Sequence, residues 1–156
     1  MGRADGSEPR KVADAEENRT VKSPVWSPDS HLLAYMSEKQ SPAGSDSSTI
    51  LVQPAASGPA RVLLADSDLP KQHRLSHHTV GLAWCSDGRL VFPVADRTNE
   101  FSPRTNFSLW QVRVDATTSH FIDKPSQLTE DNNFSVWNTV CRRRQTFIGN
   151  KEQILD

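Results

Sequence analysis

The sequence predicts an all-β protein assembled from repeated hairpins, and two observations support this prediction. The first is the segment 81–94, where an apolar run ends in Trp84, a Ser-Asp-Gly turn follows, and a second apolar run begins. The second is its recurrence, because Trp26 and Asp29 lie 58 positions before Trp84 and Asp87. Apolar runs separated by tight-turn residues are typical of β-hairpins, and recurrence at a fixed spacing is typical of repeat folds.

Composition limits the classes of function to consider. The chain has 156 residues, of which 35% are hydrophobic, below the roughly 45 to 50% of a globular domain, so we expect part of it to remain unpacked. Its 18 basic and 19 acidic side chains give a formal net charge of -1. This balance supplies no general attraction for phosphate backbones or anionic membranes, and we expect no nucleic-acid partner.

No segment approaches the roughly 18 to 20 continuous apolar residues that a membrane helix needs. The first eight residues also lack the apolar centre of a secretory signal. We therefore expect no membrane span and, by default, a cytoplasmic location.

The amino-terminal half contains a tail and one repeat. Residues 1–20 are highly charged and almost free of large aliphatic side chains, which predicts a disordered tail, with a short helix over 11–18 as the alternative. Residues 21–66 form the first repeat. Its predicted strands are 21–26, 32–37, 49–53 and 61–64, with a polar loop at 38–48. Four short antiparallel strands are the content of one β-propeller blade.

The second repeat follows a connector at 67–78 and occupies 79–130. Its predicted strands are 79–84, 89–95, 108–114 and 127–129. The strand at 108–114 alternates, with Trp110 and Val112 on one face and Leu109 on the other. Residues 131–156 form a degenerate third repeat, where Arg142-Arg143 replaces the turn residues, and we expect no third or fourth strand there.

These repeats resemble a known family. The motifs Trp-Ser-Pro-Asp-x-x-Leu-Leu-Ala-Tyr at 26–35 and Trp-Cys-Ser-Asp-Gly-Arg-Leu-Val-Phe at 84–92 resemble the WD-repeat-like blades of TolB-type β-propellers. The stretch 109–129 is most similar to propellers fused behind bacterial serine/threonine kinases. Family propellers close with six or more blades, so the resemblance implies a partial, open and incomplete propeller of four-stranded antiparallel blades.

Two further expectations follow from the blade count. Two blades and a fraction leave apolar faces without neighbours, so we expect a fragment of a longer protein, a truncated product, or one part of an assembly. The resemblance also implies a periplasmic or other extracytoplasmic location for a parent protein.

The recurring acids Asp29 and Asp87 are interpreted as caps of tight turns rather than as catalytic or calcium-binding groups. The tryptophans are interpreted as core or inter-blade packing, and an exposed ring would instead favour sugar or peptide binding. The predicted turn and packing residues are Trp26, Asp29, Tyr35, Trp84, Asp87, Gly88, Phe92 and Trp110.

The other reactive side chains do not form a recognisable site. His73, His77 and His78 lack the spacing of zinc ligands, and we expect Cys85 and Cys141 to be reduced, held too far apart to bond. The sequence has no Gly-x-Ser-x-Gly elbow, glycine-rich phosphate loop or kinase motif. We therefore predict no enzymatic activity, no cofactor and no metal.

The predicted function is that of a non-catalytic interaction module. The loops at 38–48, 66–78 and 96–107 are expected to present a surface to a protein or peptide partner, with further propeller blades in a longer chain or an oligomer as possible neighbours. The alternatives are a sensor or accessory domain detached from a bacterial kinase or peptidase, and a truncated relic without function.

Overall fold

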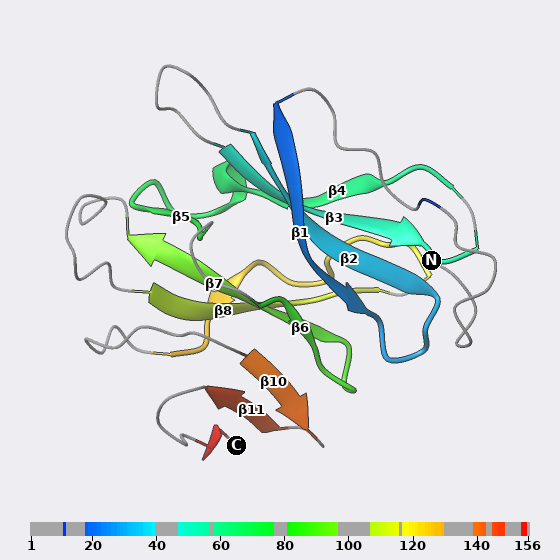
Figure 1. Ribbon diagram of the computed structural model, residues 1–156. Coiled ribbons are helices and arrows are strands. Elements are labelled where there is room, and N and C mark those ends of the chain that lie inside the picture. The colour runs from blue at the N-terminus through cyan, green and yellow to red at the C-terminus, as the bar shows by residue number, and fades with distance from the viewer. Residues whose placement is uncertain are drawn as a thin grey trace.

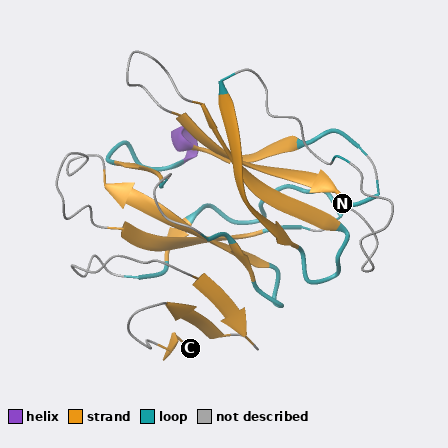
Figure 2. Ribbon diagram, viewed as in Figure 1, coloured by secondary structure: helices purple, strands orange, loops and turns teal. Residues whose placement is uncertain are grey.

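The computed structural model describes residues 11, 18–39, 47–56, 58–76, 81–96, 107–115, 117–129, 139–142, 145–148 and 154–155. In these ranges the protein consists of antiparallel strands, with one short 3-10 turn, η1 (Asp66–Asp68), and no α-helix (Figure 2). The predicted all-β class is confirmed. Figure 1 shows three layers of strands, with β1–β4 at the top, β5–β9 in the middle and β10–β12 at the bottom. Neither of the two larger sheets closes on itself.

The first sheet is an antiparallel meander in the order β1-β2-β3-β4. Its strands are β1 (Arg19–Trp26), β2 (Leu32–Lys39), β3 (Ser47–Pro54) and β4 (Arg61–Ala65). These strands lie at the positions predicted from the sequence, but each extends beyond at least one of its predicted ends. β1 begins inside the expected tail, and Lys39 pairs with Ser47, so both ends of the predicted loop at 38–48 belong to strands. Residues 1–10, 12–17 and 40–46 lie outside the described residues.

The second sheet has five strands in the order β5-β7-β8-β9, with β6 also paired to β7. Its strands are β5 (His73–Leu75), β6 (Ala83–Trp84), β7 (Arg89–Asp96), β8 (Phe107–Arg113) and β9 (Ser126–Gln127). β5 and β6 pair with successive parts of one edge of β7, where the first sheet has the single strand β1. The expected connector at 67–78 thus contributes a strand, and residues 77–80 and 97–106 lie outside the described residues.

The carboxy-terminal strands form a small third sheet. β10 (Thr139–Arg142), β11 (Gln145–Ile148) and β12 (Ile154–Leu155) are antiparallel in that order. The expectation that this repeat lacks a third strand is wrong, because Phe147 on β11 pairs with Ile154 on β12.

The two cysteines are joined in a disulfide, so the expectation of two reduced thiols is wrong. β10 lies beside β6, and Cys85 directly follows β6, which brings the Cα atoms of Cys85 and Cys141 to 5.0 Å. This spacing is within the usual range for a disulfide. The expectation of distant thiols fails because the third sheet packs directly against this end of the second. The bond therefore ties the second layer to the third.

The main core lies between the first and second sheets. It contains alternate residues of each central strand, Ala34 and Met36 from β2 and Phe92 and Val94 from β7, with Trp110 from β8. A smaller cluster on the other face of the second sheet contains Cys85, Val91 and Leu109, against which Leu128 and Cys141 pack. The second sheet is therefore covered on both faces, as expected for strands whose residues on both faces are apolar.

A single carboxylate also links the two larger sheets. Asp66 in η1 accepts a hydrogen bond at Oδ1 from the backbone N–H of Leu75 on β5, at 2.7 Å. Its Oδ2 accepts another from the backbone N–H of Ser48 on β3, at 3.2 Å. Hydrogen bonds to an ionised group are stronger than those between neutral groups, so Asp66 fixes the spacing between the sheets at this end.

Candidate functional site

The outer face of the first sheet is the candidate binding surface. Directly paired residues of antiparallel strands point to the same side of the sheet. Trp26 pairs with Leu33. Tyr35 pairs with Leu51, which in turn pairs with Val62. None of these five residues belongs to the core shared by the sheets. Trp26 is 41% exposed and Val62 58% exposed. We call these five residues the Trp26 face.

The Trp26 face occupies the same position in its sheet as the buried face of the second sheet. In the first hairpin, Trp26 lies opposite Leu33, and in the second, Trp84 lies opposite Leu90. Two positions further along the return strands, Tyr35 corresponds to Phe92. Phe92 is completely buried between the sheets, and Trp84 packs against the same cluster.

The corresponding partners on the third strands are also equivalent. Tyr35 lies opposite Leu51, and Phe92 lies opposite Trp110. The tryptophan faces of the two sheets therefore point in the same direction, and we call this same-sense stacking. The tryptophan face of the second sheet packs against the first sheet, whereas that of the first sheet points away from the second.

The hairpin turns differ by one residue, which explains why the sequence spacing of 58 does not hold beyond the turn. In the first hairpin the N–H of Ser27 bonds the carbonyl of Leu32, whereas in the second the N–H of Cys85 bonds the carbonyl of Arg89. The first loop thus contains one more residue, so the return strands correspond at a spacing of 57.

The recurring acids lie in these turns. Oδ1 of Asp29 accepts a hydrogen bond from the backbone N–H of His31 at 3.1 Å, and Oδ1 of Asp87 accepts one from the N–H of Arg89 at 3.2 Å. The Ser27 hydroxyl, which donates at 2.5 Å, and the His31 N–H hold the pKa of Asp29 below its ordinary value. Gly88 adopts a φ of 86°, in the left-handed region that glycine enters without strain. These contacts are those of turn-stabilising side chains.

Tyr35 lies on the central strand of the sheet that carries the Trp26 face. Its hydroxyl is 3.5 Å from Oε1 of Gln53, at the limit of hydrogen-bond distance. Burial raises the pKa of the Tyr35 phenol, since a desolvated phenolate is disfavoured. The centre of the Trp26 face is therefore an apolar environment, and its exposed margins are Trp26 and Val62.

The remaining predicted residues contribute to packing. Trp110 is buried, donates a hydrogen bond from Nε1 to the Ser108 hydroxyl at 3.0 Å, and has its ring centroid 5.1 Å from that of His73. His73 therefore packs, half-buried, against the core residue Trp110. His77 and His78 lie outside the described residues. Within the described ranges, no group of three or more His, Cys, Asp or Glu side chains is placed to hold a metal ion.

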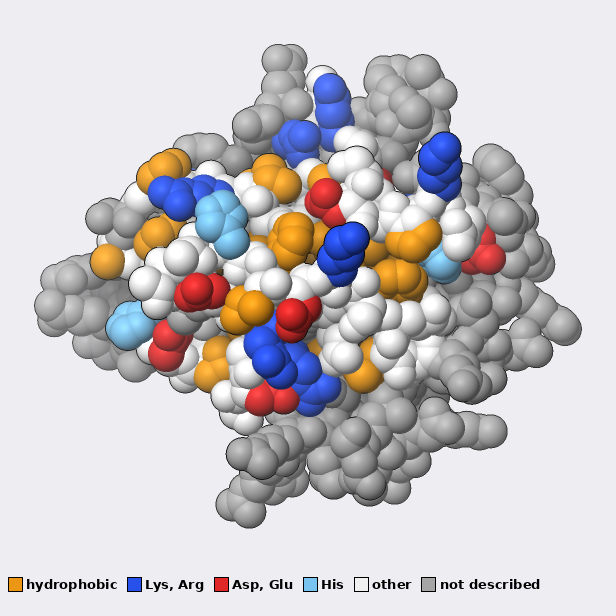
Figure 3. Space-filling model, turned by 180° about the vertical axis from the view of Figure 1, so that it is seen from behind, with side chains coloured by type: hydrophobic (Ala, Val, Ile, Leu, Met, Phe, Trp, Pro, Cys, Tyr) orange, Lys and Arg blue, Asp and Glu red, His pale blue; other side chains and the backbone are white. Residues whose placement is uncertain are grey.

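Among the described residues, charges of both signs are mixed on the side opposite to that of Figure 1. Figure 3 shows basic and acidic side chains next to one another on that side, with hydrophobic side chains between them. This distribution agrees with the formal net charge of -1 and gives no broad field for steering a highly charged ligand. No helix in the described ranges has the length and apolar character of a membrane span.

Two of the three predicted partner-binding loops, 38–48 and 96–107, fall largely outside the described residues, whereas most of the loop at 66–78 is described. The structure describes residues 38–39 and 47–48 of the first as strand residues, 66–76 of the second, and only Asp96 and Phe107 of the third. The Trp26 face was not predicted as a surface, because an apolar strand looks the same in sequence whether or not another sheet covers it. Comparison of the chain with models of known families, with curated proteins and with solved structures gives no match.

Proposed function

We propose that this protein is a non-catalytic interaction module that binds a protein partner through the Trp26 face. The observation that carries the proposal is the exposure of Trp26 and Val62 on a face whose counterpart in the second sheet is buried. Tryptophan supplies a large contact area at low conformational cost and is enriched in binding hot spots.

The second sheet indicates which partner chemistry fits. Its tryptophan face packs on the side of the first sheet that presents Ala34, Met36, Ile50 and Val52. A surface that fits the Trp26 face therefore presents small and aliphatic side chains in the alternating pattern of β-strands. Lys39 is an exposed cation on the Trp26 side, at one end of the sheet, and an acidic residue at the matching end of the partner would complement it.

Successive blades of a β-propeller are four-stranded antiparallel sheets that are related by rotation about a central axis. One face of each blade therefore packs against the opposite face of the next blade, which is the same-sense stacking seen for the two larger sheets. We therefore propose that the two larger sheets are blades of a partial, TolB-like propeller. On this proposal, the Trp26 face is the side on which a preceding blade, or a protein surface of the same shape, packs.

Site-specific photo-crosslinking tests the proposed function. Replacing Val62 with a benzophenone amino acid in the full chain should give an adduct to an apolar, β-strand segment of another protein. Trp26→Lys should abolish the adduct, because a charge would be desolvated within the contact. The same crosslinker at Ile122, which is exposed at a different site, is the matched control. Equal adducts from positions 62 and 122, or adducts insensitive to Trp26→Lys, would contradict the proposal.

A further inference from the structure

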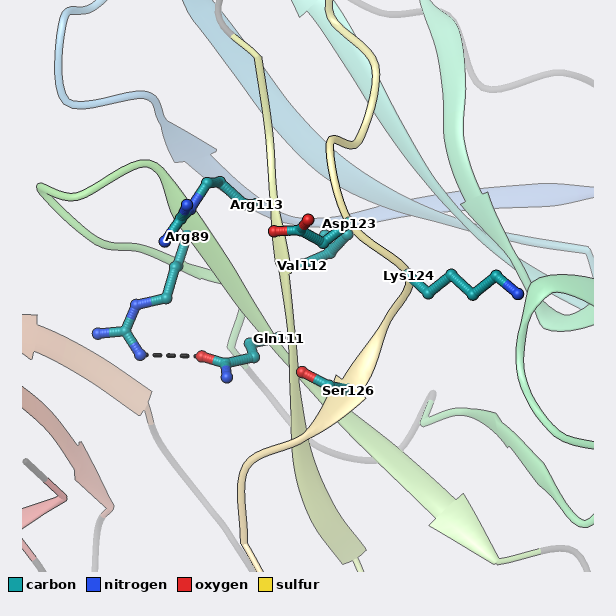
Figure 4. A pocket seen from close by; sticks show the side chains of 7 residues that line it. All are labelled: Arg89, Gln111, Val112, Arg113, Asp123, Lys124 and Ser126. Atoms are coloured by element: carbon teal, nitrogen blue, oxygen red, sulfur yellow. Dashed lines mark hydrogen bonds between the residues drawn. The ribbon is translucent and has the colours of Figure 1, made fainter.

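We propose that a hollow at the turn end of the second sheet binds a carboxylate group. The hollow has a volume of about 80 Å³ and is lined by Arg89, Gln111, Val112, Arg113, Asp123, Lys124 and Ser126. Figure 4 shows Arg89 and Gln111 joined by a hydrogen bond on one side, Asp123 and Ser126 on the other, and Lys124 extending away. The side chains come from β7, β8, β9 and the segment before β9.

Two arginines meet at this site in an arrangement that folding alone does not favour. Arg89 and Arg113 are directly paired on adjacent strands, and like charges in directly opposite positions destabilise a sheet. Among the described residues, no hydrogen bond or ion pair involves the Arg113 side chain. Local departures of this kind are expected at functional sites.

The equivalent positions of the first sheet provide a comparison with residues that serve packing alone. In the first sheet Leu32 pairs with Pro54, and in the second Arg89 pairs with Arg113. Two residues further along, Ala34 pairs with Val52, and Val91 pairs with Gln111. The residues of the first sheet that correspond to Arg89, Gln111 and Arg113 are therefore Leu32, Val52 and Pro54. Leu32 and Val52 are buried in the main core. The second sheet therefore carries polar and cationic side chains where its counterpart packs apolar ones.

The Arg89 side chain is held in place before any ligand arrives. Its Nε donates to Oδ2 of Asp87 at 2.6 Å, and its Nη1 donates to Oε1 of Gln111 at 2.8 Å. Bonding through Oε1 leaves the amide nitrogen of Gln111 as a donor. A fixed guanidinium, an amide and the Ser126 hydroxyl lose little side-chain entropy on binding, which favours affinity.

The charge of the hollow favours a singly charged group over a doubly charged one. Arg89 is already paired with Asp87, and the Lys124 side chain extends away (Figure 4), so Arg113 and Asp123 are the charges that remain at the hollow. A carboxylate carries one negative charge and accepts two parallel hydrogen bonds from a guanidinium. A phosphate monoester carries about -1.5 to -2 at pH 7 and would place excess negative charge beside Asp123. The site therefore fits a carboxylate on a glutamate or aspartate side chain.

Nuclear magnetic resonance titration of the ¹⁵N-labelled full chain at low ionic strength tests this inference. The probe is the blocked peptide acetyl-Ala-Glu-Ala-amide, compared with acetyl-Ala-Gln-Ala-amide and inorganic phosphate. The glutamate peptide should shift the amides of Gln111, Arg113 and Ser126 saturably, the glutamine peptide should not shift them, and phosphate should bind at least fivefold more weakly. Equal shifts from both peptides, or phosphate binding as tight as the glutamate peptide, would overturn the assignment.

Variants locate the binding to the hollow. Arg113→Gln should weaken glutamate-peptide binding at least fivefold and Ser126→Ala at least twofold, while Arg61→Gln, at an exposed arginine of the first sheet, should leave it unchanged. Amide signals of the first sheet report whether each variant folds. Wild-type affinity in both hollow variants, or an equal loss in Arg61→Gln, would show that the peptide responds only to general charge.

Discussion

Tyr35 on β2 and Phe92 on β7 occupy equivalent positions in their sheets, yet only Phe92 is covered by a second sheet. The first hairpin places Tyr35 two residues after Leu33, and the second places Phe92 two residues after Leu90, each on the tryptophan side of its strand. The same local design therefore produces a face packed between the sheets in one repeat. In the other it produces a face on which Leu33 and Tyr35 are buried and Trp26 and Val62 are exposed.

The ionisation of Tyr35 provides a direct probe of this environment. The chain contains one tyrosine, so absorbance at the tyrosinate band reports Tyr35 alone. Burial raises the pKa of Tyr35 above the ordinary value of 10.0, so its titration midpoint should lie above 10.0 in the native protein and near 10.0 in denaturant. Stability contributed by the neutral phenol is complete below pH 10 and falls as the pH rises through the raised pKa. Equal midpoints in the two states would show that Tyr35 is fully solvated.

The Cys85–Cys141 disulfide should leave no thiol that reacts with a chromogenic reagent in the unreduced protein. The bond closes a loop with a sequence separation of 56, and chain entropy predicts that Cys141→Ser lowers the free energy of unfolding by about 4 kcal/mol. Chemical denaturation measures this loss. Reduced wild-type protein is the control and should unfold at the same denaturant concentration as the variant, and two reactive thiols in the native chain would exclude the bond.

Removing the carboxylate of Asp66 should weaken the connection between the two larger sheets. Asp66→Ala leaves the N–H groups of Ser48 and Leu75 without their acceptor, and we expect a loss of about 2 kcal/mol in the free energy of unfolding. Asp68→Ala is the matched control, because Asp68 bonds only its local neighbour Ala65 among the described contacts. A loss no larger than that of the control would mean that Asp66 does not link the sheets.

The turn carboxylate Asp87 should make stability depend on acid pH. Burial alone would raise the pKa of Asp87, but the backbone N–H and the guanidinium of Arg89 lower it below 3.8. Its contribution is therefore complete above pH 3.8 and is lost as the pH falls through the lowered pKa. Asp87→Asn should reduce stability by about 1 kcal/mol at pH 6, and the difference from wild type should shrink below pH 3.8. A difference independent of pH would contradict this role.

Local structure was largely predictable from sequence, because turn chemistry and strand alternation are local signals. The hairpins at Asp29 and Asp87 and the alternation around Trp110 show those signals directly. The sequence predicts a polar loop at Glu38, yet Glu38 is a buried residue of β2 that forms an ion pair with Lys22 at 2.6 Å. Cross-strand pairing outweighs its weak strand propensity.

The features that sequence did not predict depend on how distant segments pack. β5 is only three residues long and pairs with β7 across a gap in sequence, so no periodic pattern reveals it. The disulfide requires the third sheet to lie against Cys85. The hollow depends on strand register, which places Arg113 at the position that Pro54 occupies in the first sheet. The sequence hides that equivalence, because the spacing between corresponding residues changes from 57 for Leu32 and Arg89 to 59 for Pro54 and Arg113.

The most direct test of the central claim is the dissociation constant of a ligand selected for the Trp26 face. A displayed library of extended peptides, panned on the full chain, should yield sequences with alternating apolar residues. Val62→Lys should raise their Kd at least tenfold, a change of about 1.4 kcal/mol, whereas Ile122→Lys should leave it unchanged. A Kd that is the same for wild type and Val62→Lys would contradict binding at this face.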